Sequence, residues 1–483
     1  MKQTISLLLI FLITSGVVSA SDSADDQSTL QLQLDVPVQQ NWLWVSPDKP
    51  RITINITNAS AADAMVTARL LINTDKMQPY MTLDKQEAVR AGQTTSVMFD
   101  LDAEPGFYQC TATVNDELAR SFVFGVDPQD IASPPDYQPD FHGFWSSTKS
   151  ELAQVDGHYT LTEIPQKSTA KRKVYLLEMH SLPDMTGEVI ARAYYAEPVA
   201  EGTYPAIVHF NGYDSGDDEP WCMGGDDNPD CVQIAVSTRG QQINNRPPYV
   251  NPYGDYFVSG FDSEYNYYYR GAYMDCVRAI DFLCSRPKVQ QHNIFAVGGS
   301  QGGAFALAAA ALADDRLNAI AVAIPFMSDF PDNFQIASWP GGAAIAKKNE
   351  LSMSDDEMYR MLSYFDIKNL ATMVTCPTYM NFSLQDNICP PHTNWAAYNN
   401  LGSTDKQYSV NPTQGHQGSP DWRSEYMAFF EAHMREPGSV DEVQTDSNPN
   451  KAIYNMQGIR VGEAWDTLPK GIYVRNGEKI AKF

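Results

Sequence analysis

Positive charge is scarce in this 483-residue chain, which has 34 Lys and Arg residues against 59 Asp and Glu residues. The net charge of −25 repels phosphate groups, so it argues against nucleic acids and anionic membrane surfaces as partners. The chain also lacks an apolar run of about 20 residues, the length that a membrane-spanning helix needs. These absences indicate a soluble protein with a solvated acidic surface and no membrane span.

Cysteine is also scarce, with seven residues and no C-x-x-C pair of the kind that holds zinc, so we expect no metal site. Because seven is odd, at least one thiol stays free or pairs between chains. Cys276 and Cys284 fall on one predicted helix, where they are too far apart to bridge. Cys222 and Cys231 bracket a loop rich in Gly, Asp and Asn, and we expect these two to form a disulfide.

The N-terminus has the pattern of a signal peptide over residues 1–20. Lys2 supplies the positive start, Ile5 to Ile13 form a short apolar run, and Val18-Ser19-Ala20 is a small-residue cleavage pattern. The pattern predicts export, so we expect a secreted, periplasmic or cell-surface protein.

Composition changes along the chain indicate three folded parts. Residues 28–127 carry short alternating runs such as Leu30 to Leu34, separated by turn residues, which predicts an all-β, sandwich-like module. A Pro-rich linker follows, and from residue 140 to 435 strands alternate with helices, which predicts a mostly parallel sheet. Residues 446–483 form a separate tail with two short β-like runs, typical either of a sorting signal or of a packed hairpin.

The central part contains a G-x-S-x-G motif at Gly298-Gly299-Ser300-Gln301-Gly302. An apolar strand over 294–297 precedes it and an Ala-rich helix over 304–312 follows, which is the context of a nucleophile elbow in an α/β-hydrolase fold. We therefore predict that Ser300 is a nucleophile. An inert serine in a Gly-rich turn is the alternative, and the acid and histidine that follow in the expected order argue against it.

A serine nucleophile needs a general base and an orienting acid, in the chain order Ser, acid, His. Of the histidines after the motif, His416 lies in a Gly-rich loop after a predicted strand over 407–410 and is the expected base. His392 is predicted to cap or pack a helix, and His433 to lie near the end of one. Asp386 follows the predicted strand 378–382 and is the expected acid, with Asp329 as the second choice.

The oxyanion of the intermediate needs two backbone N–H donors. One is that of Gln301, directly after the nucleophile, and the other is expected after an early strand, where His209-Phe210-Asn211-Gly212-Tyr213 offers the N–H of Tyr213.

Several of these motifs together resemble one family. Gly298 to Gly303 is similar to the G-x-S-Q-G-G elbow of the acetyl xylan esterase and cephalosporin C deacetylase family, carbohydrate esterase family seven. Arg239-Gly240-Gln241 resembles its R-G-Q motif, and residues 209–213, 269–275 and 324–330 resemble other segments of it. The resemblance covers about residues 140–435. In contrast to the family, Gln417 stands where a Glu usually follows the catalytic histidine.

The resemblance implies an α/β-hydrolase esterase that removes acetyl groups from xylan or xylo-oligosaccharides and needs no cofactor. Its partners would be acetylated polysaccharides or oligosaccharides, and the family is typically a homo-oligomer. Two alternatives are a serine peptidase of the same fold and a non-catalytic carbohydrate-binding protein on a hydrolase scaffold. Activity on acetyl esters but not on peptides distinguishes the first, and the intact Ser-Asp-His order argues against the second.

Overall fold

The computed structural model describes residues 31–213, 230–337 and 339–436, and the tail segments 453–455, 460–462, 471–475 and 478–482. The predicted signal peptide and Cys222 lie outside the described residues. The chain forms two compact units. The first comprises Met1–Ala132 together with Ser383–Trp395 and Val410–His416, and the second comprises the remaining residues.

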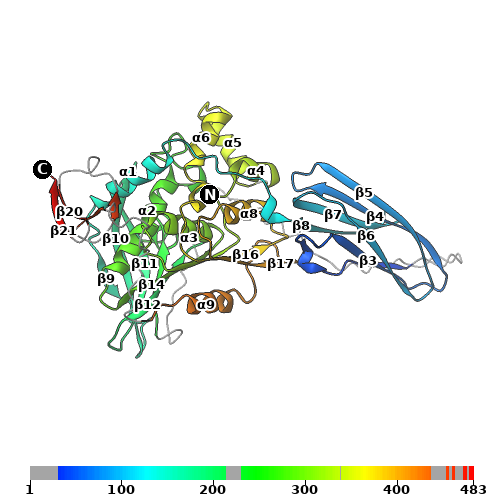
Figure 1. Cartoon of the computed structure of the whole chain (residues 1–483), viewed down its shortest axis with the longest axis horizontal. Coiled ribbons are helices and arrows are strands. Elements are labelled where there is room, and N and C mark those ends of the chain that lie inside the picture. Colours follow the sequence, from blue (N-terminus) through cyan, green and yellow to red (C-terminus); the bar gives the residue numbers. More distant parts are fainter. Residues whose placement is uncertain are drawn as a thin grey trace. The chain divides into compact units, whose positions relative to one another are not determined.

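The N-terminal part of the first unit is built from two β-sheets (blue in Figure 1). One sheet has the order β1-β3-β6 and the other β2-β8-β7-β4-β5. Ile52, Ile54 and Ile56 of β3 are buried at alternate positions, as the sequence pattern predicts. The strands are β1 (Leu32–Asp35), β2 (Leu43–Trp44), β3 (Arg51–Asn58), β4 (Ala64–Thr74), β5 (Pro79–Val89), β6 (Thr94–Asp100), β7 (Gly106–Val114) and β8 (Leu118–Val126).

A nine-stranded sheet of order β17-β16-β15-β14-β12-β13-β11-β10-β9 organises the second unit. The pairs from β13 through β12, β14 and β15 to β16 are parallel, and β11, β10 and β9 add antiparallel pairs. This confirms the expected α/β-hydrolase class with a mostly parallel sheet. The strands are β9 (Thr160–Glu163), β10 (Arg172–Asp184), β11 (Gly187–Pro198), β12 (Tyr204–Phe210), β13 (Val232–Ser237), β14 (Val289–Gly299), β15 (Ala319–Ala323), β16 (Thr378–Ser383) and β17 (Lys406–Asn411).

Helices cover both faces of this sheet (Figure 1). On one face, α9 packs through stacked rings of Phe430 and Phe295, whose centroids are 4.7 Å apart. On the other face the ring of Phe305 in α3 contacts Phe210 of β12, and every residue of α3 is buried. The helices are α1 (Phe141–Ala153), α2 (Tyr268–Cys284), α3 (Gln301–Leu312), α4 (Phe330–Ile336), α5 (Gly341–Glu350), α6 (Asp355–Ser363), α7 (Ile367–Ala371), α8 (Pro391–Asn399) and α9 (Trp422–Ala432).

The C-terminal tail forms a small sheet of its own. Its order is β19-β18-β20-β21, with bounds β18 (Ile453–Asn455), β19 (Arg460–Gly462), β20 (Gly471–Arg475) and β21 (Glu478–Lys482). The sequence predicts only two β-like runs here, and the structure adds β19 and β21, because strands of three to five residues carry little periodic signal.

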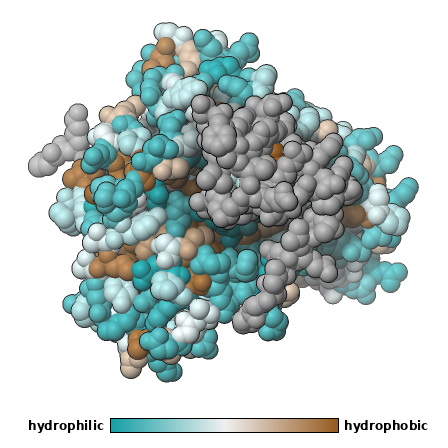
Figure 2. All heavy atoms as spheres, turned by 60° about the vertical axis from the view of Figure 1, so that its left-hand side comes forward, coloured by the Kyte–Doolittle hydropathy of each residue, from teal (hydrophilic) through white to brown (hydrophobic). Residues whose placement is uncertain are grey.

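The described part of the face drawn in Figure 2 is mostly polar. On the face drawn in Figure 2, hydrophilic residues predominate and hydrophobic ones form small separate patches, in keeping with the acidic composition. Across the described ranges, no helix combines the length and the apolar character that crossing a membrane requires.

Candidate active site

Ser300 lies at the turn between strand β14 and helix α3, in the second unit. Its backbone has φ 55° and ψ −123°, a conformation that residues with a side chain rarely adopt. Hydrogen bonds hold it there: Ser300 N donates to the carbonyl of Ala323 at 3.0 Å, and Phe326 N donates to the carbonyl of Ser300 at 3.0 Å. The side chain is half-buried. This is the strained, accessible turn that the G-x-S-x-G motif predicts.

The first turn of α3 packs unusually close to the end of β12. A Cβ atom added to Gly302 would lie 2.3 Å from the carbonyl oxygen of Phe210, and one added to Gly298 would lie 2.2 Å from the carbonyl oxygen of Gly302. Real Cβ contacts are not this short, so only glycine allows strand, turn and helix to meet at this distance. The motif glycines therefore bring the end of β12 next to the serine turn.

The peptide between Gly212 and Tyr213 is held in one orientation. Its carbonyl oxygen accepts from Nδ2 of Asn211 at 2.8 Å and from Nε2 of Gln301 at 3.1 Å. In a trans peptide the N–H points away from the carbonyl, so these two amides also fix the direction of the Tyr213 N–H. Gln301 is the first residue of α3, where a backbone N–H has no acceptor within the helix. The side chain of Gln301 thus helps to hold the peptide that carries the other predicted oxyanion donor, the N–H of Tyr213.

Buried polar side chains extend this network to the R-G-Q segment. Oε1 of Gln241 accepts from Nδ2 of Asn211 and from Nε2 of Gln301, both at 2.9 Å. The hydroxyl of Tyr268 accepts from Nε2 of Gln241 at 2.8 Å, and the hydroxyl of Tyr269 donates to Oε1 of Gln301 at 2.8 Å. Desolvation raises the pKa of both tyrosines well above 10, so both hydroxyls keep their protons.

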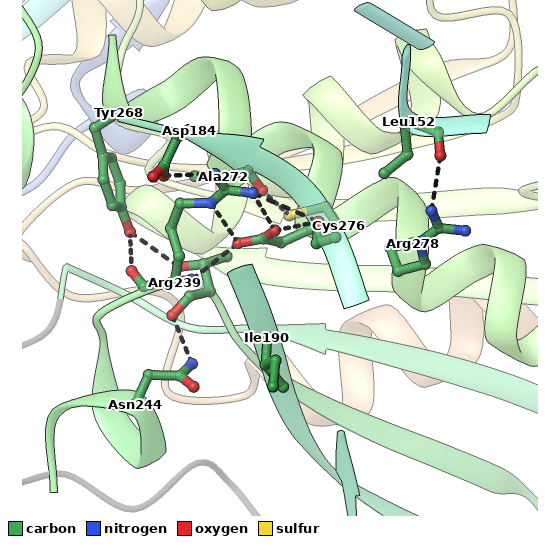
Figure 3. Close-up of polar contacts among 12 residues, drawn as sticks. Leu152, Asp184, Ile190, Arg239, Asn244, Tyr268, Ala272, Cys276 and Arg278 are labelled. Atoms are coloured by element: carbon green, nitrogen blue, oxygen red, sulfur yellow. Dashed lines mark hydrogen bonds and ion pairs between the residues drawn. The ribbon is translucent and has the colours of Figure 1, made fainter. Parts of the chain in front are cut away.

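Arg239 anchors this segment in the protein interior. Its guanidinium binds the Asp275 carboxylate twice, at 2.6 and 3.0 Å, and Asp184 at 2.9 Å. In Figure 3 the side chain of Arg239 reaches Asp184, while Tyr268 donates to its backbone carbonyl. Burial favours the neutral form of Asp184, but the Arg239 charge and the hydrogen bonds from Thr186 and Tyr253 together outweigh it and keep the pKa of that carboxyl below its usual value. The segment that carries Gln241 is therefore firmly tied to α2 and β10.

Asp386 and His416 form a hydrogen-bonded pair in the first unit. Nδ1 of His416 lies 2.8 Å from Oδ2 of Asp386. The other carboxylate oxygen accepts the backbone N–H groups of Ile388 and Cys389, both at 2.9 Å. The Asp386 side chain is fully buried, whereas 23% of the His416 side chain is exposed. The Asp386 carboxylate is buried and held by two backbone N–H groups, so its contact with Nδ1 fixes the orientation of the His416 ring and the direction of Nε2.

The other candidate residues, Asp329, His392 and His433, contact groups other than Asp386 and His416. Asp329 forms an ion pair with Lys368 at 3.0 Å and accepts from the hydroxyl of Ser133 at 2.5 Å. His392 opens α8 and its Nδ1 lies 2.6 Å from Oδ2 of Asp75. His433 follows α9, and its Nδ1 lies 2.8 Å from the carbonyl oxygen of Phe429. These positions match the structural roles expected for the two histidines, and they leave Asp386 as the carboxylate that faces His416.

The disulfide prediction receives no support among the described residues. Cys231 is a free, buried thiol whose sulfur lies 3.2 Å from the carbonyl oxygen of Val232, and Cys222 lies outside the described residues. Burial raises the pKa of the Cys231 thiol to about 12, so the thiol stays protonated. By contrast, Cys276 and Cys284 do lie on one helix, α2, as predicted, and both are free.

Sequence reasoning missed the side chains that arrange the site. In the sequence, Asn211 and Gln241 stand out only as parts of motifs, although both bind the peptide or the amide that orients the predicted oxyanion donors. Gln385 has no pattern in the sequence that marks it beyond its place next to Asp386. Such roles depend on partners distant in the chain, so a single sequence carries no direct signal for them.

Comparisons with known proteins agree on one family. Residues 132–434 match the family model described as acetyl xylan esterase (AXE1). The acetyl esterase Axe7A of Xylanibacter ruminicola is 24% identical over 415 residues, which cover 84% of this chain and 91% of that protein. Among solved structures, an acetyl xylan esterase from Paenibacillus sp. R4 is 30% identical with a TM-score of 0.56, and the match covers 64% of this chain and 98% of that one.

A second solved structure shows the same fold. Acetyl xylan esterase 1 from Thermoanaerobacterium sp. JW/SL YS485 is 24% identical with a TM-score of 0.57, again over 64% of this chain and 98% of that one. The matches to both structures leave a large part of this chain uncovered.

Proposed function

The chain belongs to the acetyl xylan esterase family and is a carboxylic ester hydrolase, and we propose that it removes acetyl groups from xylan or xylo-oligosaccharides. The catalytic residues of this proposal are Ser300, His416 and Asp386. The observation that carries it is the strained turn at Ser300 together with the His416–Asp386 pair at 2.8 Å.

The first half of the reaction forms an acyl-enzyme. Oγ of Ser300 attacks the acetyl carbonyl carbon, and Nε2 of His416 takes the serine proton, because Nδ1 faces Asp386. The tetrahedral oxyanion receives hydrogen bonds from the N–H groups of Gln301 and Tyr213. When the bond between the carbonyl carbon and the sugar oxygen breaks, the imidazolium returns its proton to that oxygen and the deacetylated sugar leaves.

The second half of the reaction releases acetate. Water attacks the acetyl–Ser300 ester while His416 accepts its proton, and the proton passes to Oγ when the ester bond breaks. The Asp386 carboxylate stabilises the imidazolium in both halves. The sequence of steps needs no metal and no organic cofactor.

An aromatic cluster beside the oxyanion peptide favours a short acyl group. The ring of Tyr213 packs edge-on against Trp339, with centroids 5.2 Å apart, and Phe326 stacks on Trp339 at 4.7 Å. The Tyr213 hydroxyl donates to Asp255 at 2.6 Å, which holds this ring in place. On the acyl side of the site, such a fixed aromatic wall would clash with added methylene groups, which is why we propose acetyl as the preferred acyl group.

We also propose that the enzyme acts outside the cytoplasm, on the basis of the signal-peptide pattern in residues 1–20. Polymeric xylan is an extracellular substrate by size, which agrees with export. The alternatives of a serine peptidase or a non-catalytic binding protein are disfavoured by membership in an esterase family.

The proposal is tested with p-nitrophenyl acetate, butyrate and octanoate beside acetylated xylo-oligosaccharides. We expect acetyl esters to be hydrolysed best, and Ser300→Ala to lower kcat by a factor of about 10⁴–10⁶. Ser424→Ala, which changes a serine of α9, is the matched control and should behave like the wild type. Near-normal turnover by Ser300→Ala would contradict the mechanism, and octanoate as the best substrate would contradict the deacetylase assignment.

A further inference from the structure

The loops that carry Asp386 and His416 belong to the same compact unit as the N-terminal β-sheets. Ser383–Trp395 and Val410–His416 lie in the same compact unit as the β1–β8 sheets, although they follow strands β16 and β17 of the central sheet. Backbone hydrogen bonds join the two loops to each other: Leu384 N donates to Asn411 O, and Gln385 N donates to Gln414 O, both at 3.0 Å. The acid loop and the histidine loop therefore behave as one element.

The side chain of Gln385 ties this element to strand β8. Its Oε1 accepts the backbone N–H of Val123 at 2.8 Å, and its Nε2 donates to the Val123 carbonyl at 3.1 Å. The same Nε2 donates to the carbonyl of Pro412 at 2.6 Å. The half-buried Gln385 amide thus uses its oxygen and both of its protons. From the acid loop it contacts both strand β8 of the N-terminal sheets and the histidine loop.

The position on β8 explains why an amide fits. Strand β2 pairs only with Gly125 and Val126, while β7 pairs with the opposite edge of β8 along its whole length. Beyond the end of β2, the N–H and C=O of Val123 face away from β7 and need a partner. The Gln385 amide presents one acceptor and one donor side by side, so it replaces the missing strand at this point.

A second contact joins the same parts of the unit. Nδ1 of His392, in the acid loop segment, lies 2.6 Å from Oδ2 of Asp75, which directly follows β4. The Asp75 and His392 side chains are 14% and 11% exposed, so this hydrogen bond is largely shielded from solvent. The sandwich therefore contacts the acid loop at two separate points.

We propose that Gln385 is a positioning residue of the esterase and that the N-terminal β-sheets serve catalysis by holding the Asp386–His416 pair through it. Gln385 is adjacent to Asp386 in the chain, and Pro412 is four residues before His416, so a shift at Gln385 moves both members of the pair. The inference rests on the proposed function, because it assigns a role only if this pair activates Ser300.

The test compares Gln385→Met with the wild type in the full-length chain. Methionine keeps the length of the side chain and removes all three hydrogen bonds. We expect kcat on p-nitrophenyl acetate to fall between about 10- and 100-fold, the effect of a displacement of about 1 Å, with KM within about twofold. The rate of Ser300 modification by a phosphonylating reagent should fall in parallel, because that reaction needs the same base and no sugar site.

Two controls keep the outcome interpretable. Ser121→Ala removes the Thr111–Ser121 hydroxyl contact two residues along β8 and should leave kcat and the modification rate unchanged. If Gln385→Met does not fold, as judged by circular dichroism, Gln385→Glu replaces it: glutamate keeps the acceptor for Val123 N–H and loses both donated bonds, and the same fall in kcat is expected.

The results separate this inference from the proposed function. Wild-type kcat in a folded Gln385 variant, with His416→Ala inactive, overturns the positioning role and leaves the esterase mechanism standing. Substantial activity in His416→Ala overturns the mechanism itself, whatever the Gln385 variants do. A loss of kcat in Gln385→Met that Ser121→Ala shares equally also overturns the proposal, because it would reflect general damage to β8.

Discussion

Alanine at Gly302 tests whether the close approach of α3 to β12 holds the reactive geometry. The added Cβ would lie 2.3 Å from Phe210 O, 2.9 Å from Phe210 C and 3.0 Å from Asn211 O. All three are backbone atoms, so no side chain can rotate away. Restoring an ordinary contact of 3.4 Å requires the helix start and the end of β12 to separate by about 1 Å.

The displacement falls on the residues that the mechanism needs. Gly302 is two residues after Ser300, and Asn211 binds the peptide that presents the Tyr213 N–H. A shift of about 1 Å in such a site can lower the rate by about 100-fold. Overpacking of this kind also lowers the free energy of unfolding by about 1–3 kcal/mol. We therefore expect Gly302→Ala to lose about two orders of magnitude in kcat/KM on p-nitrophenyl acetate.

Neighbouring glycines supply matched controls within the same motif. A Cβ on Gly299 would meet only Ala323 Cβ and O at 3.8 Å, which is ordinary contact, and one on Gly303 would lie 3.1 Å from Ala323 O. The expected order of damage is Gly302→Ala, then Gly303→Ala, then Gly299→Ala, measured by kcat/KM and by melting temperature. Activity of Gly302→Ala within about twofold of Gly299→Ala would refute the reasoning.

Two further predictions concern titratable residues. Asp386→Asn should lower kcat by about 10⁴-fold, as loss of an orienting acid does. Asp329→Asn should mainly lower the melting temperature, because it breaks a buried ion pair with Lys368. A greater loss of kcat in Asp329→Asn than in Asp386→Asn would show that the acid is misassigned. Burial lowers the pKa of His209 to about 3. Unfolded histidine takes up a proton below about pH 6.5, so the stability contributed by neutral His209 is complete above that value and declines as pH falls from about 6.5 towards 3. The melting temperature of His209→Gln should therefore fall less between pH 7 and pH 5 than that of the wild type, and an equal fall would contradict this linkage.

Elements with a strong apolar pattern could be predicted from the sequence, because their burial leaves a local signature. The expected strand 378–382 is observed as Thr378–Ser383 and the expected strand 407–410 as Lys406–Asn411. The edge strand β5 was missed, since its residues are mostly exposed and do not alternate between apolar and polar. Helices α4 to α7 were also not predicted, because short, partly exposed helices carry weak periodicity.

The elbow was predictable for the same local reason. Its glycines, its serine, the preceding strand and the following helix are consecutive in the chain, so the sequence alone determined the turn and its type. Chain order and loop position could nominate Asp386 and His416, but they could not exclude Asp329. Only the tertiary structure shows which carboxylate faces the histidine: Asp329 pairs with Lys368, and Asp386 lies against His416.

The support around the site was decided by tertiary structure alone. Gln385 and Val123 are 262 positions apart, and Asn211 and Gln241 are 30 apart. Amide side chains have no periodic signature in a sequence. An amide can hold two segments together only when folding brings an unsatisfied backbone group within hydrogen-bond distance of it. The sequence therefore determined the class of fold and the candidate chemistry, while the packing of distant segments decided which side chains hold that chemistry in place.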